Sequence, residues 1–388
     1  MFAANPRSRV LAVAEPRTDY RHQMALQYGI PAGCVFPDWQ TLVAARPAVD
    51  AAFIGTMDRD HIGPAIACLD LGYDLLLEKP MGISLEECQQ IEAKQRATGR
   101  IVGVCHSLRY QAGFRRVKEI LDSGRIGRPV TLDLIEQVAW WHQAHSFVRG
   151  NWGNSSRSTF MLLAKSCHDI DYLHYLLGRQ CVKVSSFGAL SYFRPENAPA
   201  GAGERCVHCP VEPSCIYSAI RQYVDGKRDE WPGNMVSLDH SRQAHYEAIR
   251  TGPYGRCVWK CDNDVVDHQT VNLLFEGDVT ATFTMTAFTY DGGRRLRING
   301  TLGDLAFDEK TIVVRRFGEP RAETIDLAGQ EGTHGGGDQR IADEFVESLY
   351  TRDDGRLVAN AQEALKTHSV VFAAERSRLE GRTIDLME

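Results

Sequence analysis

Tyr73-Asp-Leu-Leu-Leu-Glu-Lys-Pro-Met-Gly82 is the stretch of sequence that decides the fold. It is a short apolar run that ends in an acid, a lysine and a proline. Buried strands of parallel sheets are continuous apolar runs, and ligands of open α/β sheets bind beyond the carboxyl ends of the strands. Pro80 holds the residue before it extended. We therefore expect a strand over 73–78 and Lys79 at a ligand-binding edge; the alternative is a solvated Glu78–Lys79 pair.

Strands and helices alternate around this segment. We expect strands over 10–15, 50–56 and 100–105, and helices over 19–28, 38–45, 61–71 and 84–98. This alternation is typical of a parallel sheet covered by helices on both faces. The sequence therefore predicts an α/β domain with a parallel sheet over residues 1–108.

The pattern changes near residue 110, and strands dominate after residue 180. Residues 278–288 alternate between threonine and apolar side chains, as in a half-buried strand of an antiparallel or mixed sheet. Residues 192–256 are rich in Gly, Pro and Cys and are interpreted as an insertion. We expect a second α/β domain over 109–388 with a large mixed or antiparallel open sheet.

Composition narrows the classes of partner. The 388 residues carry a formal net charge of −6, which gives no reason to expect nucleic acid or an anionic membrane as a partner. No apolar run approaches the ~20 residues needed to cross a bilayer. The first residues lack the basic and apolar regions of a signal peptide, so the cytoplasm is the expected compartment.

Five of the eleven cysteines are clustered. In a reducing compartment such clustering favours a metal over disulfides. Four thiolates could hold a structural zinc, and the candidates are Cys206, Cys209, Cys215 and Cys261, with Cys257 nearby. An iron–sulfur cluster or unliganded cysteines are the alternatives.

A second polar motif lies in the apolar helical stretch that ends at Gly178. Lys165, His168, Asp169 and Tyr172 are spaced i, i+3, i+4 and i+7, so on one helix they share a face. The apolar residues on either side predict little exposure, although a solvated face is the alternative. Because buried ionisable groups are unfavourable unless paired or functional, the motif indicates a functional site.

Two segments are candidates for contacting a dinucleotide. Glu15 ends the first expected strand, where an acid can accept hydrogen bonds from ribose hydroxyls, and Arg17 could instead hold a 2′-phosphate. A surface acid is the alternative. Thr56, Met57 and His61 lie where the next strand becomes a helix, and backbone N–H groups there can face a phosphate or ribose.

Taken together, these features resemble the glucose–fructose oxidoreductase/inositol dehydrogenase (GFO/IDH/MocA) family. The matching pieces are Ala14–Pro16, Glu78–Pro80, His106–Tyr110, Arg149–Trp152, Lys165–Tyr172, Gly300–Gly303 and His334–Asp338. The resemblance covers nearly the whole chain. It implies a Rossmann domain, then a mixed α/β domain whose open sheet often mediates dimers or tetramers, and NAD(P)-dependent redox chemistry on sugars or cyclitols.

The resemblance also suggests roles for individual residues. Lys79 and His168 belong to the catalytic pocket, and Lys165 and Asp169 supply charge beside them. Glu78 and His106 join Glu15, Arg17, Thr56, Met57 and His61 as expected cofactor contacts, and Arg109, Arg149, Trp152 and Tyr172 are expected in the wall of the substrate pocket.

Two departures from the family pattern stand out. Position 164 is alanine where the family usually has aspartate. No Gly-x-Gly-x-x-Gly loop occurs near the start, so we expect that the family's first strand, phosphate loop and first helix are missing, either through a late start assignment or because the cofactor is bound differently.

The leading hypothesis is an NAD(P)-dependent dehydrogenase of a sugar, sugar derivative or cyclitol, with NAD favoured through Glu15. The alternatives are an NAD-dependent glycosidase that works by transient oxidation and elimination, and a non-catalytic sugar-binding pseudoenzyme.

Overall fold

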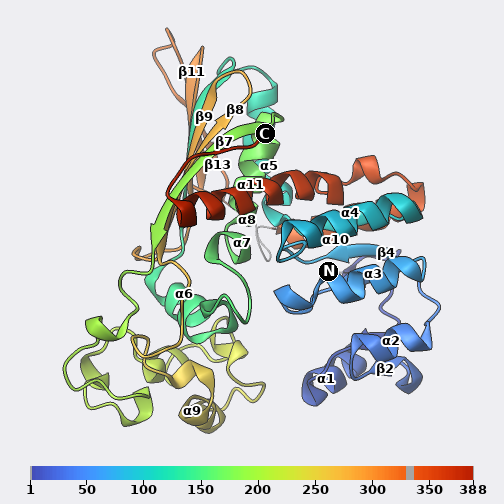
Figure 1. Ribbon diagram of the computed structural model, residues 1–388, viewed down its shortest axis with the longest axis vertical. Helices are drawn as coiled ribbons and strands as arrows, with labels where there is room; N and C mark the ends of the chain where they lie inside the picture. Colours follow the sequence, from blue (N-terminus) through green and yellow to red (C-terminus); the bar gives the residue numbers. More distant parts are fainter. Residues whose placement is uncertain (1, 329–335, 388) are drawn as a thin grey trace. The chain divides into compact units, whose positions relative to one another are not determined.

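The computed structural model describes residues 2–328 and 336–387, so His334 and Gly335 of the last family motif lie outside the described residues. The chain forms two compact units (Figure 1). Unit 1 comprises Met1–Pro129, Cys167–Gln180 and Asn299–Phe372, and unit 2 comprises Val130–Ser166, Cys181–Ile298 and Ala373–Glu388. The boundary expected at residues 108–109 stays a prediction.

The centre of unit 1 is a parallel sheet in the order β3 (Ala51–Ile54), β4 (Asp74–Leu77), β5 (Val102–Val104). All of β4 is buried. Successive side chains of a strand point to opposite faces, so Leu75 and Leu77 join a core with α3 (Ile62–Asp70) and α4 (Leu85–Thr98), whereas Leu76 joins one with α10 (Gly337–Thr351). The predicted parallel sheet with two covered faces is confirmed.

The first residues of unit 1 form a separate two-stranded parallel sheet. It pairs β1 (Val13–Ala14) with β2 (Val35–Phe36), next to α1 (Thr18–Tyr28) and α2 (Trp39–Ala45). Within the described residues, no strand joins β1–β2 to β3–β4–β5. The parallel strands of the dinucleotide-binding region are therefore divided between two sheets.

Helix boundaries in unit 1 follow the local sequence signals. Ser84 caps α4 by accepting a hydrogen bond from the Glu87 N–H at 3.2 Å, and the Glu87 carboxylate accepts one from the Ile83 N–H at 2.8 Å. These bonds satisfy N–H groups that a helix start leaves unpaired. The helix expected over residues 84–98 is confirmed.

The expectation that Lys165 lies on one helix with His168, Asp169 and Tyr172 is wrong. The structure has α7 (Met161–Ala164) and α8 (Cys167–Leu177), separated by Lys165 and Ser166. Lys165 is the C-cap of α7, and its ammonium pairs with the Glu136 carboxylate at 3.2 Å. Lys165 therefore does not share a helix face with His168.

Unit 2 is built on a mixed sheet. Its strands run in the order β10 (Gly293–Gly300), β6 (Pro129–Gln137), β9 (Val279–Thr286), β8 (His268–Phe275), β7 (Cys181–Ala189) and β14 (Ile384–Asp385). β6 and β9 are parallel, while β7, β8, β9 and β14 pair antiparallel. β9 buries alternate side chains, as predicted.

Unit 1 also contains three antiparallel strands. These are β11 (Gly303–Phe307), β12 (Thr311–Arg316) and β13 (Glu323–Asp326). The Cys-containing segment of unit 2 contains short turns and α9 (Arg242–Thr251) around two small apolar cores.

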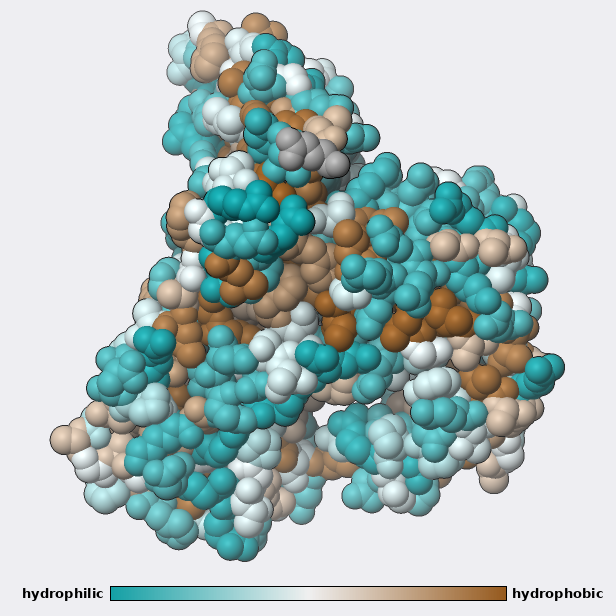
Figure 2. All heavy atoms as spheres, in the orientation of Figure 1, coloured by the Kyte–Doolittle hydropathy of each residue, from teal (hydrophilic) through white to brown (hydrophobic). Residues whose placement is uncertain are grey.

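Figure 2 shows hydrophilic residues over most of the visible face. Among the described residues, no helix has the length and hydropathy required to cross a bilayer.

Candidate active site

The loop after β4 carries the Glu78-Lys79-Pro80 motif and is held in place by two buried histidines. His61 lies with Nδ1 2.6 Å from the Pro80 carbonyl oxygen and Nε2 3.1 Å from the Thr56 carbonyl oxygen. The Met81 N–H donates to Nε2 of His368, on α11 (Ala361–Glu380), at 3.0 Å. His61 was expected to touch a cofactor, but it is 1% exposed and both ring nitrogens face carbonyls. It ties together the loops that follow β3 and β4.

A buried imidazole lies at the centre of the site. His106 follows β5, is fully buried, and neither ring nitrogen makes a hydrogen bond. Its ring centroid is 5.9 Å from that of His168 and 5.6 Å from that of His368. Burial lowers the pKa of His106 to about 3, despite the opposing charge of Asp171, so the ring is neutral.

The helix that carries His168 is anchored by a buried ion pair. Arg109 donates from Nε and Nη2 to the two carboxylate oxygens of Asp171 at 2.6 and 2.8 Å, and Thr367 donates to Oδ1 at 2.9 Å. Burial alone would raise the pKa of Asp171, but the Arg109 charge and these hydrogen bonds hold it below its usual value. Arg109 also donates to the Val358 carbonyl. This pair fixes the start of α8 next to the segment that contains His106.

Lys79 interacts electrostatically with the residues around His106 and His168. Its charge acts on His106, on Glu78 and on Cys167, the residue before His168. Burial raises the pKa of the Cys167 thiol to about 12, and the Lys79 charge opposes that rise. The Lys79 charge is therefore felt both by His106 and by the first residue of α8. Lys79 and His168 keep partial exposure while His106 is buried.

The carboxylate of Glu15 is engaged by its neighbour. Arg17 donates from Nε and Nη2 to the two carboxylate oxygens at 2.7 and 2.9 Å, and from its backbone N–H at 2.9 Å. These hydrogen bonds lower the pKa of Glu15. A ribose diol must therefore compete with Arg17 for this carboxylate, and the same guanidinium can meet a 2′-phosphate.

Lys165, Arg149 and Trp152 belong to unit 2, so their part in the site stays a prediction. Arg109 and Tyr172, expected in a pocket wall, are instead packed inside unit 1: Arg109 pairs with Asp171, and the Tyr172 hydroxyl donates to the Phe114 carbonyl at 2.8 Å.

Thr56 and Met57 occupy the loop after β3, and Met57 is exposed. Asp169 is fully buried on α8.

His368 and Thr367 were not expected at this site. Both lie on α11, nearly 200 residues from α8 along the chain. In the sequence they belong to the polar run Lys366–Ser369 of a helix that carries many polar residues, and no local pattern distinguishes them from the others.

Four cysteines of unit 2 line one small cavity of about 10 Å³: Cys206, Cys209, Cys215 and Cys257. Cys261, expected as a ligand, is not part of this lining; its thiol donates to the Cys257 carbonyl at 3.3 Å. Across residues 2–328 and 336–387, no three His, Cys, Asp or Glu side chains already form a metal-binding arrangement.

Two family models match the chain. The model described as the oxidoreductase family, NAD-binding Rossmann fold, matches residues 1–106, and that of the GFO/IDH/MocA C-terminal domain matches residues 114–306.

Curated relatives agree with these matches. A Bacillus subtilis (strain 168) protein named only as an oxidoreductase, YteT, is 26% identical over 76% of this chain and 72% of its own length. The inositol 2-dehydrogenase of Pseudomonas savastanoi pv. phaseolicola is 29% identical, over 46% of this chain and about half (49%) of the relative.

The same fold occurs in solved structures. An oxidoreductase from Agrobacterium radiobacter, crystallised with NAD+, L-tartaric acid and magnesium, has a TM-score of 0.71 at 15% identity, over 99% of this chain and 93% of that one. The chain therefore belongs to the GFO/IDH/MocA family, with an NAD-binding Rossmann domain, and is an oxidoreductase of the class that acts on CH–OH groups.

Proposed function

We propose that this protein is an NAD(P)-dependent dehydrogenase that oxidises a carbinol carbon of a sugar, a sugar derivative or a cyclitol. One observation carries the proposal: the buried His106 has the His168 ring 5.9 Å away, at the start of α8, and feels the charge of Lys79, which follows a buried parallel strand. Two partly exposed groups that can exchange protons, one beyond a strand and one at a helix start, match the chemistry of alcohol oxidation.

The arrangement of unit 1 suits a nicotinamide cofactor. The carboxyl ends of the parallel strands β3, β4 and β5 lead into Thr56–Met57, Glu78–Lys79 and His106. Ligands of open α/β sheets bind at such an edge. Glu15 and Arg17 would hold the adenosine ribose or its phosphate. When bound, the cofactor accepts the hydride.

Lys79 and His168 are assigned the transfer of the substrate's hydroxyl proton. Oxidation of a carbinol sends a hydride to the nicotinamide and leaves a hydroxyl proton for a base. Lys79 hydrogen-bonds the reacting oxygen, and His168 is the alternative base. The bonds from His61 and His368 to the loop around Pro80 hold Lys79 in position.

The relatives support the substrate class. One of them is named scyllo-inositol 2-dehydrogenase (NAD(+)), from Bacillus subtilis, at 27% identity over 65% of this chain. A polyol ring is therefore the first substrate to try. The proposal includes a cytoplasmic location and assembly into a homodimer or homotetramer. Light scattering measures this oligomeric state.

The test is NAD(P)H formation with a panel of inositols, aldoses and sugar acids. We expect absorbance at the nicotinamide band with at least one polyol and not without substrate. Release of an aglycone from a glycoside with no net NADH would instead indicate elimination chemistry. Binding of a sugar without any nucleotide binding would indicate a pseudoenzyme. Either result would overturn the proposal.

A further inference from the structure

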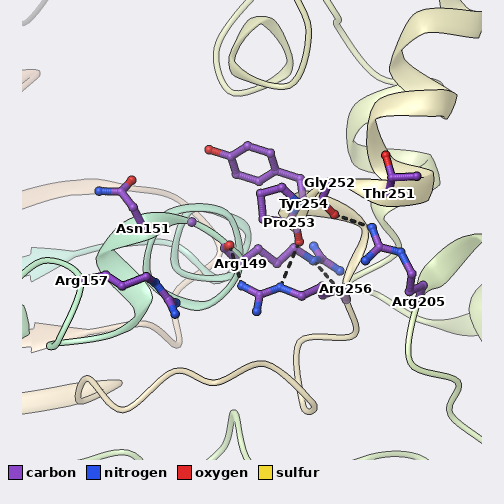
Figure 3. Close-up of a pocket in the computed structure, with 10 residues that line it drawn as sticks. Arg149, Asn151, Arg157, Arg205, Thr251, Gly252, Pro253, Tyr254 and Arg256 are labelled. Carbon is purple, nitrogen blue, oxygen red and sulfur yellow. Dashed lines mark hydrogen bonds between the residues drawn. The ribbon is translucent and has the colours of Figure 1, made fainter. Parts of the chain in front are cut away.

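A second pocket, of about 460 Å³, lies within unit 2 (Figure 3). It is lined by residues 149–151 and 251–254 together with Arg157, Arg205 and Arg256. The volume falls within the range of small-molecule sites. In Figure 3 the Tyr254 ring and the Arg256 guanidinium lie on opposite sides of the group of lining residues.

Positive charge dominates this lining. Four of the ten lining residues are arginines: Arg149, Arg157, Arg205 and Arg256. Asp262 pairs with both Arg157 and Arg256, and Asp264 adds a second negative charge near Arg157. Arg149 and Arg205 reach no carboxylate at ion-pair distance among the described residues. The arginines therefore outnumber the carboxylates, and a bound anion would be attracted.

The two arginines without a carboxylate are held by backbone carbonyls. Arg149 donates to the carbonyls of Arg256 at 2.8 Å and Tyr217 at 2.6 Å, and Arg205 donates to that of Ile249 at 2.7 Å. These bonds fix both guanidiniums in place before any ligand arrives. A preorganised guanidinium loses little side-chain freedom on binding.

Hydrogen-bond donors are also in excess. Three buried N–H groups of the lining lack hydrogen-bond partners: Nη1 of Arg149, Nδ2 of Asn151 and Nε of Arg205. The Tyr223 hydroxyl interacts with the Arg149 guanidinium, so Asn151 and Arg205 hold the clearest unpaired donors. No lining residue has a buried side-chain acceptor without a partner. Because unpaired buried donors are unfavourable, the site is matched by a ligand rich in acceptor oxygens.

One wall is a rigid aromatic ring. Tyr254 stacks on His145 with centroids 4.6 Å apart and an interplanar angle of 5°. A fixed aromatic ring in a lining that also carries guanidinium groups provides an apolar surface and a charged one for the same ligand.

We infer that this pocket binds an anionic saccharide, that is, a polyol carrying a carboxylate or phosphate. The saccharide part rests on the proposed function, whereas the anionic part rests on the arginines and the unpaired donors.

Calorimetric titration of the purified full chain without nicotinamide tests this inference, so a failure of the dehydrogenase assay does not affect the result. The probes are D-glucuronate, glucose 6-phosphate, glucose and inorganic phosphate. We expect at least one anionic sugar to bind about tenfold more tightly than glucose, and the difference to shrink as salt rises.

A matched pair of variants localises the binding. Arg157→Gln removes a guanidinium from the pocket, whereas Arg242→Gln removes one from another exposed Arg–Asp pair, with Asp225, outside it. Loss of one charge-assisted hydrogen bond is expected to weaken the anionic sugar about tenfold in Arg157→Gln and not in Arg242→Gln.

Equal weakening in both variants would overturn the inference. So would glucose binding as tightly as the anionic sugars, inorganic phosphate binding as tightly as glucose 6-phosphate, or no binding by any probe.

Discussion

The buried pair of Arg109 and Asp171 gives the sharpest energetic prediction. The Arg109 side chain is 3% exposed and that of Asp171 is fully buried. Replacing Asp171 with Leu removes two hydrogen bonds from Arg109 and one from Thr367, and leaves a guanidinium without its counter-ion. Removal of one partner of such a pair costs about 3–5 kcal/mol. Arg109→Met leaves the carboxylate unpaired and is expected to cost about the same.

The double variant distinguishes pairing from general damage to the core. With both charges replaced by apolar groups, no buried charge is left unpaired, so the double variant should be more stable than either single variant. Urea titration followed by circular dichroism measures the three free energies of unfolding. The exposed pair of Lys183 and Asp385 is the control, with an expected coupling below about 1 kcal/mol. Additive losses at Arg109 and Asp171, within roughly 0.5 kcal/mol, would refute the reasoning.

Three further predictions concern the cofactor, acid stability and metal. Arg17→Ala frees Glu15 from its ion pair, so the ratio of kcat/KM for NAD to that for NADP should rise about tenfold; an unchanged ratio would contradict this. Burial lowers the pKa of His106 to about 3 and that of His368 to about 4. Below about pH 6.5 only the unfolded chain takes up these protons, so Tm should fall towards pH 4, and His106→Gln should flatten this fall. If Cys206, Cys209, Cys215 and Cys257 hold a structural zinc, mass spectrometry of the intact protein should find about one zinc, lost in Cys209→Ser; a metal-free, equally stable protein would reject it.

Local signals accounted for most of unit 1. The apolar run of β4 and the Ser84 cap of α4 are short-range features, and both occur where the sequence places them. The same is true of the alternation in β9. Such elements are predictable because each depends on residues within one or two turns.

The failures come from partners distant in sequence. The helical pattern continues through Lys165, but α7 ends at Ala164, α8 begins at Cys167, and Lys165 pairs with Glu136 on β6. The sequence of Arg109 and Tyr172 is the same whether these polar side chains line a pocket or are buried in a core. Only the positions of Asp171 and Phe114 decide between these outcomes.

The assignment of Lys79 and His168 as the proton-handling groups is tested most directly by steady-state turnover of Lys79→Met and His168→Gln, with NADH affinity measured in parallel by fluorescence. Loss of a proton-transfer group should lower kcat about 10²–10⁴-fold while NADH affinity stays close to that of the unmodified chain. Turnover within tenfold of the original in both variants would contradict the assignment.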